Sequence, residues 1–556
     1  MKKIAKWAMA AAFICGASVF TACSSDDDKN GNNDGSPALV LIAKTGSIDY
    51  FQQIESAFRD ACKEKGLQAL YYSTTGDNAY DEQVEAVKQL EQLKDKSIKG
   101  VIYAPSHGLN GETADAEVAA FAKKRGIPVI LLDSKVDANS PLAGCPFFGT
   151  DDTAAGKAMA EEVTADKVAA FAVKNSPGIE RAEAFKAVKP DADIYPCGEN
   201  ANSDIQAVID QYDDFVFMNG TPLPAALDML KKAGKNIYTF DIYDEFLDEL
   251  IAGNPMFKGI IVQNTFLMTQ KAVDAALAGA KEGEMIPTFF INGFNLYDDI
   301  VQPYLKFYNK PAAPVIDNLP EKLLGKWMMA EIDGKPVPTD SKQVLTYESG
   351  SKFYYSLSIS AASDLNVWVN HCEGSYTING NKLSQVVELP NANIKFMHSP
   401  TIISITDNNM FLIAYNETYV DGKSYRITKD LKERKVRVTH DYSADVIGTW
   451  EGRQTSDEDT YSDGLLHRWE FKADGTFVYY RLDNNGEWVA DVNSMAEYFV
   501  DGVLMCMRWK NVGNDIEYRE SWEIASIENG KMNWTAIRQK TDGSTYTATF
   551  QMSKVK

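Results

Sequence analysis

Residues 38–43 read ALVLIA, an unbroken apolar run that is typical of a strand buried on both faces of a parallel sheet. An amphipathic stretch follows over 50–66, where Phe51, Ile54 and Phe58 recur at helical spacing before Gly66 ends the pattern. The same alternation of strand and helix is expected at 67–72, 81–93, 100–104, 114–124 and 128–132. This order predicts a parallel sheet with helices on both faces.

A second series of alternating elements begins near residue 147. Short apolar runs predict its strands at 147–149, 167–173, 215–218, 236–240 and 259–262, with helical patterns between most of them. Two such series within about 275 residues predict two α/β lobes rather than one sheet. The chain is expected to return toward the first lobe at Gln263.

Ligands of α/β sheets bind at the carboxyl ends of the strands, so the residues that follow each predicted strand, or open the next helix, are the candidates for a site. These residues are an aromatic pair and a set of planar polar groups: Tyr50, Phe51, Asp133, Arg181, Asn219, Asp241 and Gln263. A sugar needs this mixture, because its C–H face packs on an aromatic ring while its hydroxyls both donate and accept hydrogen bonds.

Simpler roles stay open for several of these candidates. Asp133 and Asp241 are also suited to capping a following helix. Arg181 is close enough in sequence to pair with Glu183, or with another surface acid. Phe51 is in phase with the apolar positions of its helix, which favours a place in the core and makes Tyr50 the better stacking residue.

Six short motifs in a fixed order add a family resemblance. They are 48–51 (IDYF), 128–133 (PVILLD), 180–185 (ERAEAF), 216–219 (VFMN), 238–241 (YTFD) and 261–263 (IVQ). In this order they resemble the type 1 periplasmic sugar-binding proteins, the ribose/galactose-binding family with a LacI-like core. The resemblance covers 38–312 and implies a two-lobed sugar-binding domain of the periplasmic-binding-protein-like I fold, with the seven candidates as ligand-binding residues.

Two departures from the ribose-binding pattern stand beside these motifs. Ser134 follows Asp133 where those proteins carry arginine, and Gly220 replaces the usual acidic neighbour of the asparagine. The resemblance therefore implies a pocket of altered shape, and the particular sugar stays open. A transporter or a sensor in the membrane is the partner that the family implies.

The amino end has the pattern of a targeting segment. Lys2, Lys3 and Lys6 precede an apolar run at 7–20, which is too short to span a bilayer and instead fits a secretory signal. Residues 20–23 (FTAC) resemble a lipobox with Phe in place of the usual Leu, which predicts removal of 1–22 and acylation of Cys23. The alternative is a signal cleaved at another small residue, with Cys23 incidental.

Residues 23–37 carry almost no apolar side chains and are expected to form an acidic, flexible tether. The run of aspartates at 26–28 resembles the export signal of surface lipoproteins in some Gram-negative anaerobes. We therefore expect a lipid-anchored protein of the cell envelope, on the outer-membrane surface rather than facing the periplasm. The alternative is that the aspartates are only a solvated spacer.

The helical pattern stops at 311–314 (PAAP), and short alternating strands with Asp-Gly and Asn-Gly turns follow. This half contains an internal repeat at an offset of about 122 residues. The paired segments are 324–327 with 447–450, 376–380 with 498–502, 404–407 with 526–529, and 421–425 with 542–546. Two tandem β domains are predicted, at 320–444 and 445–556.

Each copy opens with Gly-x-Trp, at Trp327 and at Trp450. This start, together with 469–477 (WEFKADGTF), resembles lipocalin-like (calycin) domains. The resemblance implies two all-β barrels of eight strands. The interior of such a barrel either holds a small apolar ligand or is filled by side chains.

Composition excludes other classes of function. Hydrophobic residues make up 45% and charged residues 24% of the 556 positions, as in globular proteins. The net charge of 56 − 78 = −22 repels phosphate backbones, so nucleic acid is not expected as a partner. No zinc-binding spacing, nucleophile elbow or phosphate loop occurs, so we expect no enzyme activity, metal or cofactor.

The leading expectation is a lipid-anchored carbohydrate-binding protein that captures a monosaccharide or small glycan for uptake or sensing. The alternative is a surface protein that interacts with glycans or a host, in which the β domains bind and the two-lobed domain is a scaffold.

Overall fold

The protein is described by a computed structural model covering residues 36–76, 78–165, 167–359, 365–389, 393–458, 464–491, 493–511 and 516–555. The predicted signal at 1–22, Cys23 and nearly all of the tether at 23–37 lie outside these residues. The chain divides into two compact units, of which the first contains the segments up to Asp151 and from Gln263 to Pro287. The second contains Asp152–Val262 and the chain from Thr288 onward.

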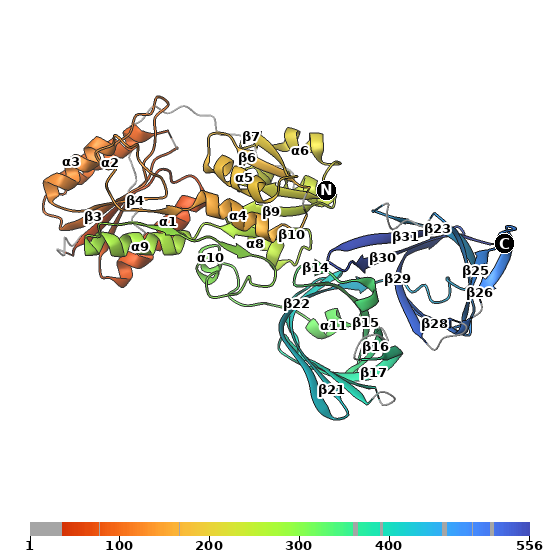
Figure 1. Cartoon of the computed structure of the whole chain (residues 1–556). Coiled ribbons are helices and arrows are strands. Elements are labelled where there is room, and N and C mark those ends of the chain that lie inside the picture. The colour runs from red at the N-terminus through yellow and green to blue at the C-terminus, as the bar shows by residue number, and fades with distance from the viewer. Residues whose placement is uncertain are drawn as a thin grey trace, which may run out of the picture. The chain divides into compact units, whose positions relative to one another are not determined.

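The first unit is an α/β lobe with an all-parallel sheet in the order β11-β5-β4-β3-β1-β2. Its strands are β1 (Ala38–Ile42), β2 (Gln68–Tyr72), β3 (Ile98–Tyr103), β4 (Val129–Leu132), β5 (Phe147–Thr150) and β11 (Glu284–Ile286). Its helices are α1 (Asp49–Glu64), α2 (Tyr80–Gln92), α3 (Asp115–Arg125) and α9 (Thr265–Ala278). In Figure 1, α9 is green among red and orange elements, because the chain returns to this lobe late.

Alternate residues of β1 face opposite layers of helices, as expected for a strand covered on both sides. Leu39 and Leu41 pack in a core cluster that contains residues of α1 and α9, whereas Val40 and Ile42 pack in another that contains residues of α2 and α3. Phe51 of α1 is 3% exposed and belongs to the first cluster. The predicted fully buried strand at 38–43 is thus confirmed.

The second unit begins with another α/β lobe, whose sheet has the order β12-β10-β9-β8-β6-β7. Its strands are β6 (Ala169–Val173), β7 (Asp193–Cys197), β8 (Asp214–Phe217), β9 (Asn236–Phe240), β10 (Phe257–Val262) and β12 (Phe289–Ile291). Its helices are α4 (Asp152–Glu162), α5 (Pro177–Val188), α6 (Asn202–Val208), α7 (Leu223–Lys232), α8 (Asp244–Ile251) and α10 (Gln302–Phe307). Apart from the antiparallel edge strand β12, each strand corresponds to one of the first lobe, so the prediction of two α/β lobes is confirmed.

The first β domain is a closed antiparallel barrel, because β22 pairs with both β21 and β13. It is formed by β13 (Gly325–Ile332), β15 (Gln343–Glu348), β16 (Lys352–Ile359), β17 (Val367–Asn379), β18 (Lys382–Leu389), β19 (Ile394–His398), β21 (Asn409–Val420) and β22 (Lys423–Val438). The additional elements are α11 (Leu319–Leu323), β14 (Lys335–Pro336), η1 (Thr339–Ser341) and β20 (Thr401–Ile405).

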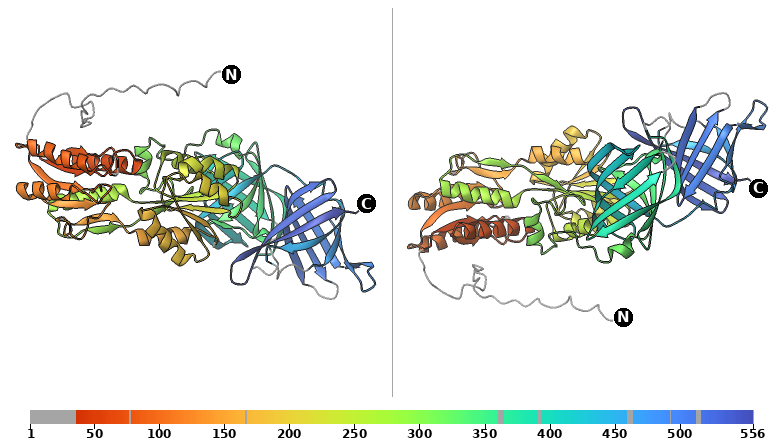
Figure 2. Two further views of the ribbon diagram at one scale, coloured as in Figure 1. Left: turned by 90° about the horizontal axis from the view of Figure 1, so that it is seen from above. Right: turned by 90° about the horizontal axis from the view of Figure 1, so that it is seen from below.

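The second β domain has the strand order β26-β25-β24-β23-β31-β30-β29-β28-β27 and is an open, half-barrel sheet. An isolated bridge between Thr476 and Glu497 links β27 to the region before β25, and Tyr498 donates there from its N–H to the Gly475 carbonyl and from its hydroxyl to the Lys472 carbonyl, both at 2.8 Å. The strands are β23 (Gly448–Ser456), β24 (Leu466–Phe471), β25 (Phe477–Leu482), β26 (Trp488–Asp491), β27 (Asn493–Asp501), β28 (Leu504–Asn511), β29 (Glu517–Glu528), β30 (Lys531–Gln539) and β31 (Thr545–Lys554). Figure 2 shows both β domains from two further sides, in green to blue.

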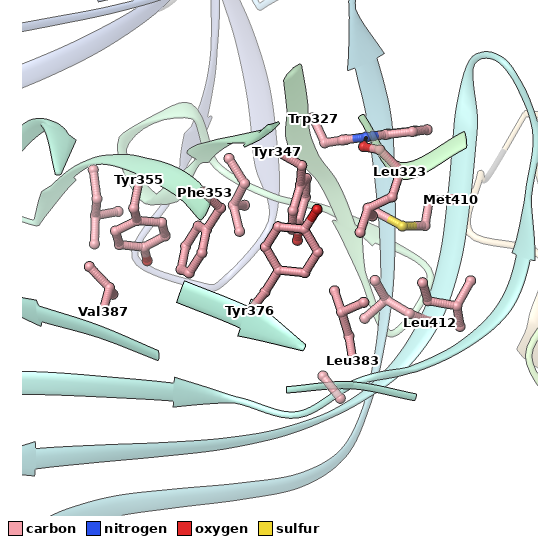
Figure 3. Close-up of a cluster of buried hydrophobic side chains, with 14 of the residues drawn as sticks. Leu323, Trp327, Tyr347, Phe353, Tyr355, Tyr376, Leu383, Val387, Met410 and Leu412 are labelled. Atoms are coloured by element: carbon pink, nitrogen blue, oxygen red, sulfur yellow. Dashed lines mark hydrogen bonds between the residues drawn. The ribbon is translucent and has the colours of Figure 1, made fainter. Parts of the chain in front are cut away.

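The two repeat tryptophans occupy matching places. Trp327 and Trp450 are both fully buried, and their indole nitrogens donate to the carbonyls of Leu323 at 2.8 Å and Val446 at 2.7 Å, four residues earlier in each copy. Figure 3 shows Trp327 beside Leu323 in the core of the first barrel. Equivalent burial and hydrogen bonding support the internal repeat that the sequence predicts.

A smaller hydrophobic cluster joins the two β domains. Met328, Val344 and Val438 of the first barrel pack with Phe499 and Cys506 of the second domain. Ion pairs between Lys326 and Asp501 and between Lys342 and Glu523 flank this cluster. The two domains therefore have separate main cores but share a buried contact.

In the part of the chain that the structure describes, no helix has the length and hydropathy needed to cross a bilayer.

Candidate functional site

In the first lobe, Asp133 lies directly after β4 at the carboxyl edge of the sheet. Its backbone is in the left-handed region, with φ of 63°, and its N–H donates to the carbonyl of Phe148 at 2.8 Å. The Tyr50 hydroxyl donates to one carboxylate oxygen at 2.7 Å and the Ser134 hydroxyl to the other at 2.9 Å. The structure thus brings two predicted site residues, Tyr50 and Asp133, into direct contact.

In the same lobe, a hydrogen bond fixes Gln263, whereas packing in the core fixes Phe51. The Thr150 hydroxyl at the end of β5 donates to Oε1 of Gln263 at 2.9 Å, and this orients the amide. The Phe51 ring lies edge-on to Tyr50, with centroids 5.3 Å apart, and packs in the core. The core role that the sequence left open for Phe51 is therefore observed, while its contact with a ligand stays a prediction.

In the second lobe, Arg181 lies in the second turn of α5 and is 3% exposed. Its Nε donates to Asp152 at 2.7 Å, its Nη1 donates to the carbonyl of Met218 at 3.1 Å, and the guanidinium lies 4.6 Å from the centroid of Phe240. The suggested pairing with Glu183 is wrong, because Asp152 at the start of α4 supplies the carboxylate. Three fixed contacts orient the guanidinium.

Asn219 follows β8 and faces the start of α5. Its Oδ1 accepts from the backbone N–H of Val173 at 3.0 Å and from the Ser176 hydroxyl at 3.3 Å. Gly178 allows this approach, because a Cβ there would come within 1.8 Å of Oδ1. With the oxygen engaged by the protein, the Nδ2 group is the part of the amide that can donate to a ligand.

Asp241 follows β9 and repeats the geometry of Asp133. Its φ is 64°, its N–H donates to the carbonyl of Ile261 at 3.0 Å, and one carboxylate oxygen accepts from the N–H of Gly220 at 3.3 Å. Because β9 occupies the same position in its sheet as β4, the two aspartates are structurally equivalent. The helix-cap alternative is wrong for both, since no helix starts after Asp133 and α8 has Tyr243 at its N-cap.

The sequence reasoning missed the residues that hold these groups in place: Asp152, Thr150 and Gly178. Thr150 ends β5 and Asp152 begins α4, so the expectation that ligands bind after strand ends would also have indicated them. Gly178 has a local signal, because it follows Ser176-Pro177, a helix N-cap with proline at the first position.

Each lobe thus presents side chains that can form hydrogen bonds with hydroxyl groups. The aspartates accept hydrogen bonds, Arg181 and the Asn219 amide donate, and Gln263 can do both. Fixed partners reduce the rotamer entropy that would be lost on binding. Within the described ranges, no group of three or more His, Cys, Asp or Glu side chains could hold a metal ion.

Charged side chains of the first barrel lie in its interior. A cavity of about 230 Å³ is lined by residues that include His398 and Lys435. His398 Nε2 lies 3.3 Å and Lys435 Nζ 3.2 Å from Glu433 Oε2. Burial opposes ionisation of Glu433, but Lys435 and His398 hold the pKa of its carboxyl well below its usual range. The buried charges therefore neutralise one another.

Comparisons with known proteins support the fold of the first half. Residues 39–284 match the model of the periplasmic binding protein domain family, which agrees with the two α/β lobes of the structure. No curated protein matches the chain. The likeness of the β domains to lipocalins stays a prediction.

Several solved structures are similar to part of the chain. A solute-binding protein from Agrobacterium vitis with bound D-fucose is 18% identical, covers 48% of this chain and 99% of its own, and has a TM-score of 0.40. A Caulobacter myo-inositol binding protein bound to myo-inositol is 20% identical, covers 48% of this chain and 96% of its own, with a TM-score of 0.39. An arabinose binding protein from Geobacillus stearothermophilus is 18% identical, covers 47% and 98%, and has a TM-score of 0.39.

Proposed function

We propose that this protein is a lipid-anchored carbohydrate-binding protein that captures a monosaccharide or small glycan. The candidate ligand-binding residues are Tyr50, Asp133 and Gln263 in the first lobe and Arg181, Asn219 and Asp241 in the second, with Phe51 supporting Tyr50. Capture serves uptake through a transporter or signalling through a sensor in the membrane.

One observation carries this proposal: each lobe ends its fourth strand with an aspartate in the left-handed conformation, held by the neighbouring strand. Backbone conformations of this kind are uncommon outside glycine and gather at ligand-binding sites. Equivalent carboxylates at the carboxyl edges of the two sheets suit a ligand that offers hydroxyl groups, and the match of 39–284 to the periplasmic binding protein domain agrees with that use.

The anchor and the location are also part of the proposal. Acylation of Cys23 would attach the protein to the membrane, since buried methylene groups contribute about 0.8 kcal/mol each. The run of aspartates at 26–28 then favours display on the outer-membrane surface. The β domains would be lipocalin-like modules between the sugar-binding domain and the carboxyl end of the chain.

A thermal-shift screen of the full chain against monosaccharides and small polyols tests the proposed ligand class. Ligand at 100 times its Kd adds about 2.7 kcal/mol of stability, which a melting curve resolves. A reproducible rise in Tm with at least one sugar is expected. If no sugar or polyol changes Tm at millimolar concentration, the proposed ligand class is wrong.

Cell fractionation and protease treatment of whole cells test the anchor. Replacing Cys23 by Ser should release the protein from the membrane fraction. Replacing the aspartates at 26–28 by Ala should keep it in the membrane and protect it from external protease. If the triple variant is digested as readily as the parent, the acidic run has no role in export.

A further inference from the structure

The open β domain encloses a cavity of about 340 Å³ that differs in character from the sugar-binding lobes. Six aromatic side chains line it: Trp469, Phe477, Tyr479, Trp509, Trp522 and Phe550. Its volume is at the small end of the range for small-molecule sites. The rings come from β24, β25, β28, β29 and β31, so the walls are built on paired strands.

One carboxylate in this wall has no counter-ion. Glu520 lines the cavity, and the Trp522 indole N–H donates to its Oε2 at 3.2 Å. Across the described part of the chain, no cationic side chain lies within ion-pair distance, 4.0 Å, of Glu520. Burial raises the pKa of its carboxyl, while Arg538 and the Trp522 bond partly offset this effect. Glu520 is half-buried, and a carboxylate that is partly removed from water without an ion-pair partner is costly when ionised.

The other charged and titratable groups near Glu520 already have partners. Arg481 pairs with Asp491 across β25 and β26, and Nδ1 of His467 lies 2.7 Å from the Tyr479 hydroxyl. Arg538 of β30 pairs with Asp340 and lies 4.6 Å from the centroid of Trp522. Glu520 is therefore the carboxylate that a ligand can complement.

In the first β domain a different residue stands at the position equivalent to Glu520. By the repeat offset of 520 − 398 = 122 residues, Glu520 corresponds to His398. His398 lies against Glu433, which Lys435 also contacts, so that interior supplies its own counter-charges. In the second copy the nearby cations Arg481 and Arg538 pair with Asp491 and Asp340, and neither forms an ion pair with Glu520.

We propose that the cavity of the second β domain binds a small organic ammonium ion, with its nitrogen against Glu520 and its carbon groups against the aromatic walls. Aromatic faces attract cations, most strongly when the cation is desolvated. The carboxylate adds a charge-assisted contact in the same place. An uncharged apolar ligand, as in the general expectation for such barrels, would leave Glu520 without a partner.

Isothermal titration of the full chain with choline tests this proposal, with its neutral isostere, in which carbon replaces the quaternary nitrogen, as the matched ligand. Choline should bind, and the isostere should bind at least about tenfold more weakly, as expected for loss of one charged contact. Choline affinity should rise with pH as Glu520 loses its proton, because the cation favours the ionised carboxylate. Absence of choline binding at millimolar concentration, or equal binding of the isostere, would overturn the proposal.

Two glutamine variants test whether Glu520 is the carboxylate that binds choline. Glu520→Gln should lose at least about tenfold in choline affinity and abolish its pH dependence. Glu497→Gln removes a carboxylate that pairs with Arg508 outside the cavity lining, and it should bind choline as the parent does. Thermal unfolding without ligand should show that Glu520→Gln is at least as stable as the parent, because a half-buried carboxylate without an ion-pair partner has been removed. Unchanged choline affinity in Glu520→Gln would refute the role of this residue.

Discussion

Replacing Trp327 by Ala should destabilise the first β domain and leave the core of the second intact. Trp327 is fully buried in the main cluster of the first barrel, and substitution of a buried large aromatic by Ala costs about 3–5 kcal/mol. Its indole N–H also donates to Leu323, and the Arg437 guanidinium lies 4.2 Å from its centroid. The Phe variant keeps most of the buried area and loses these two contacts, at about 1–2 kcal/mol.

Hydrogen exchange with mass spectrometry separates the two domains in this experiment. In Trp327→Ala, protection should fall in peptides of 325–438 and persist in 448–554, and Trp450→Ala should show the reverse. The two costs should add within about 0.5 kcal/mol, because the two main cores are separate. Equal loss of protection in both domains from either substitution would refute two separate cores and assign control to the shared contact around Met328 and Phe499.

Three further predictions concern the α/β lobes. Tyr50→Phe removes the hydroxyl that donates to Asp133 and keeps the ring, so sugar affinity measured by titration should fall about tenfold or less, whereas Tyr50→Ala should cost more. Gly178→Ala should push Asn219 out of place, since the new Cβ lies 1.8 Å from Oδ1, and should lower both sugar affinity and Tm; unchanged values would contradict this packing. A chain ending near Pro314 should retain the sugar affinity of the full chain, and loss of that affinity would place the β domains in the binding site.

Local patterns in the sequence were sufficient to predict the two α/β lobes, because each strand and each helix has its own hydrophobic periodicity. The run at 38–43 and the aspartates after the fourth strands were found from neighbours in sequence alone. The motif order supported both aspartates as candidates, and the structure shows that they are equivalent in position and backbone conformation. The short strand β7 was missed, because DIYPC contains a proline and alternates poorly.

Long-range pairing was the part that the sequence did not predict. Asp152 is 29 residues from Arg181, and nothing in either local pattern indicates that they meet. Whether a sheet closes into a barrel depends on whether its edge strands, here β26 and β27, pair with each other, and the pattern of each strand alone does not predict that. Glu520 was likewise missed. It lies in a strand rich in charged residues, and the sequence does not show that aromatic side chains of other strands surround it.

Isothermal titration tests most directly whether the α/β lobes bind a sugar through the proposed residues. The full chain and its double variant Arg181→Ala and Asp241→Ala are each titrated with the monosaccharide that raises the Tm of the full chain most. Each side chain contributes a charged hydrogen bond worth about 1.5–3 kcal/mol, so the double variant should bind at least about hundredfold more weakly. Glu183→Gln, an exposed position on the same helix, should bind as the parent does. Unchanged sugar affinity in the double variant would contradict the proposed site.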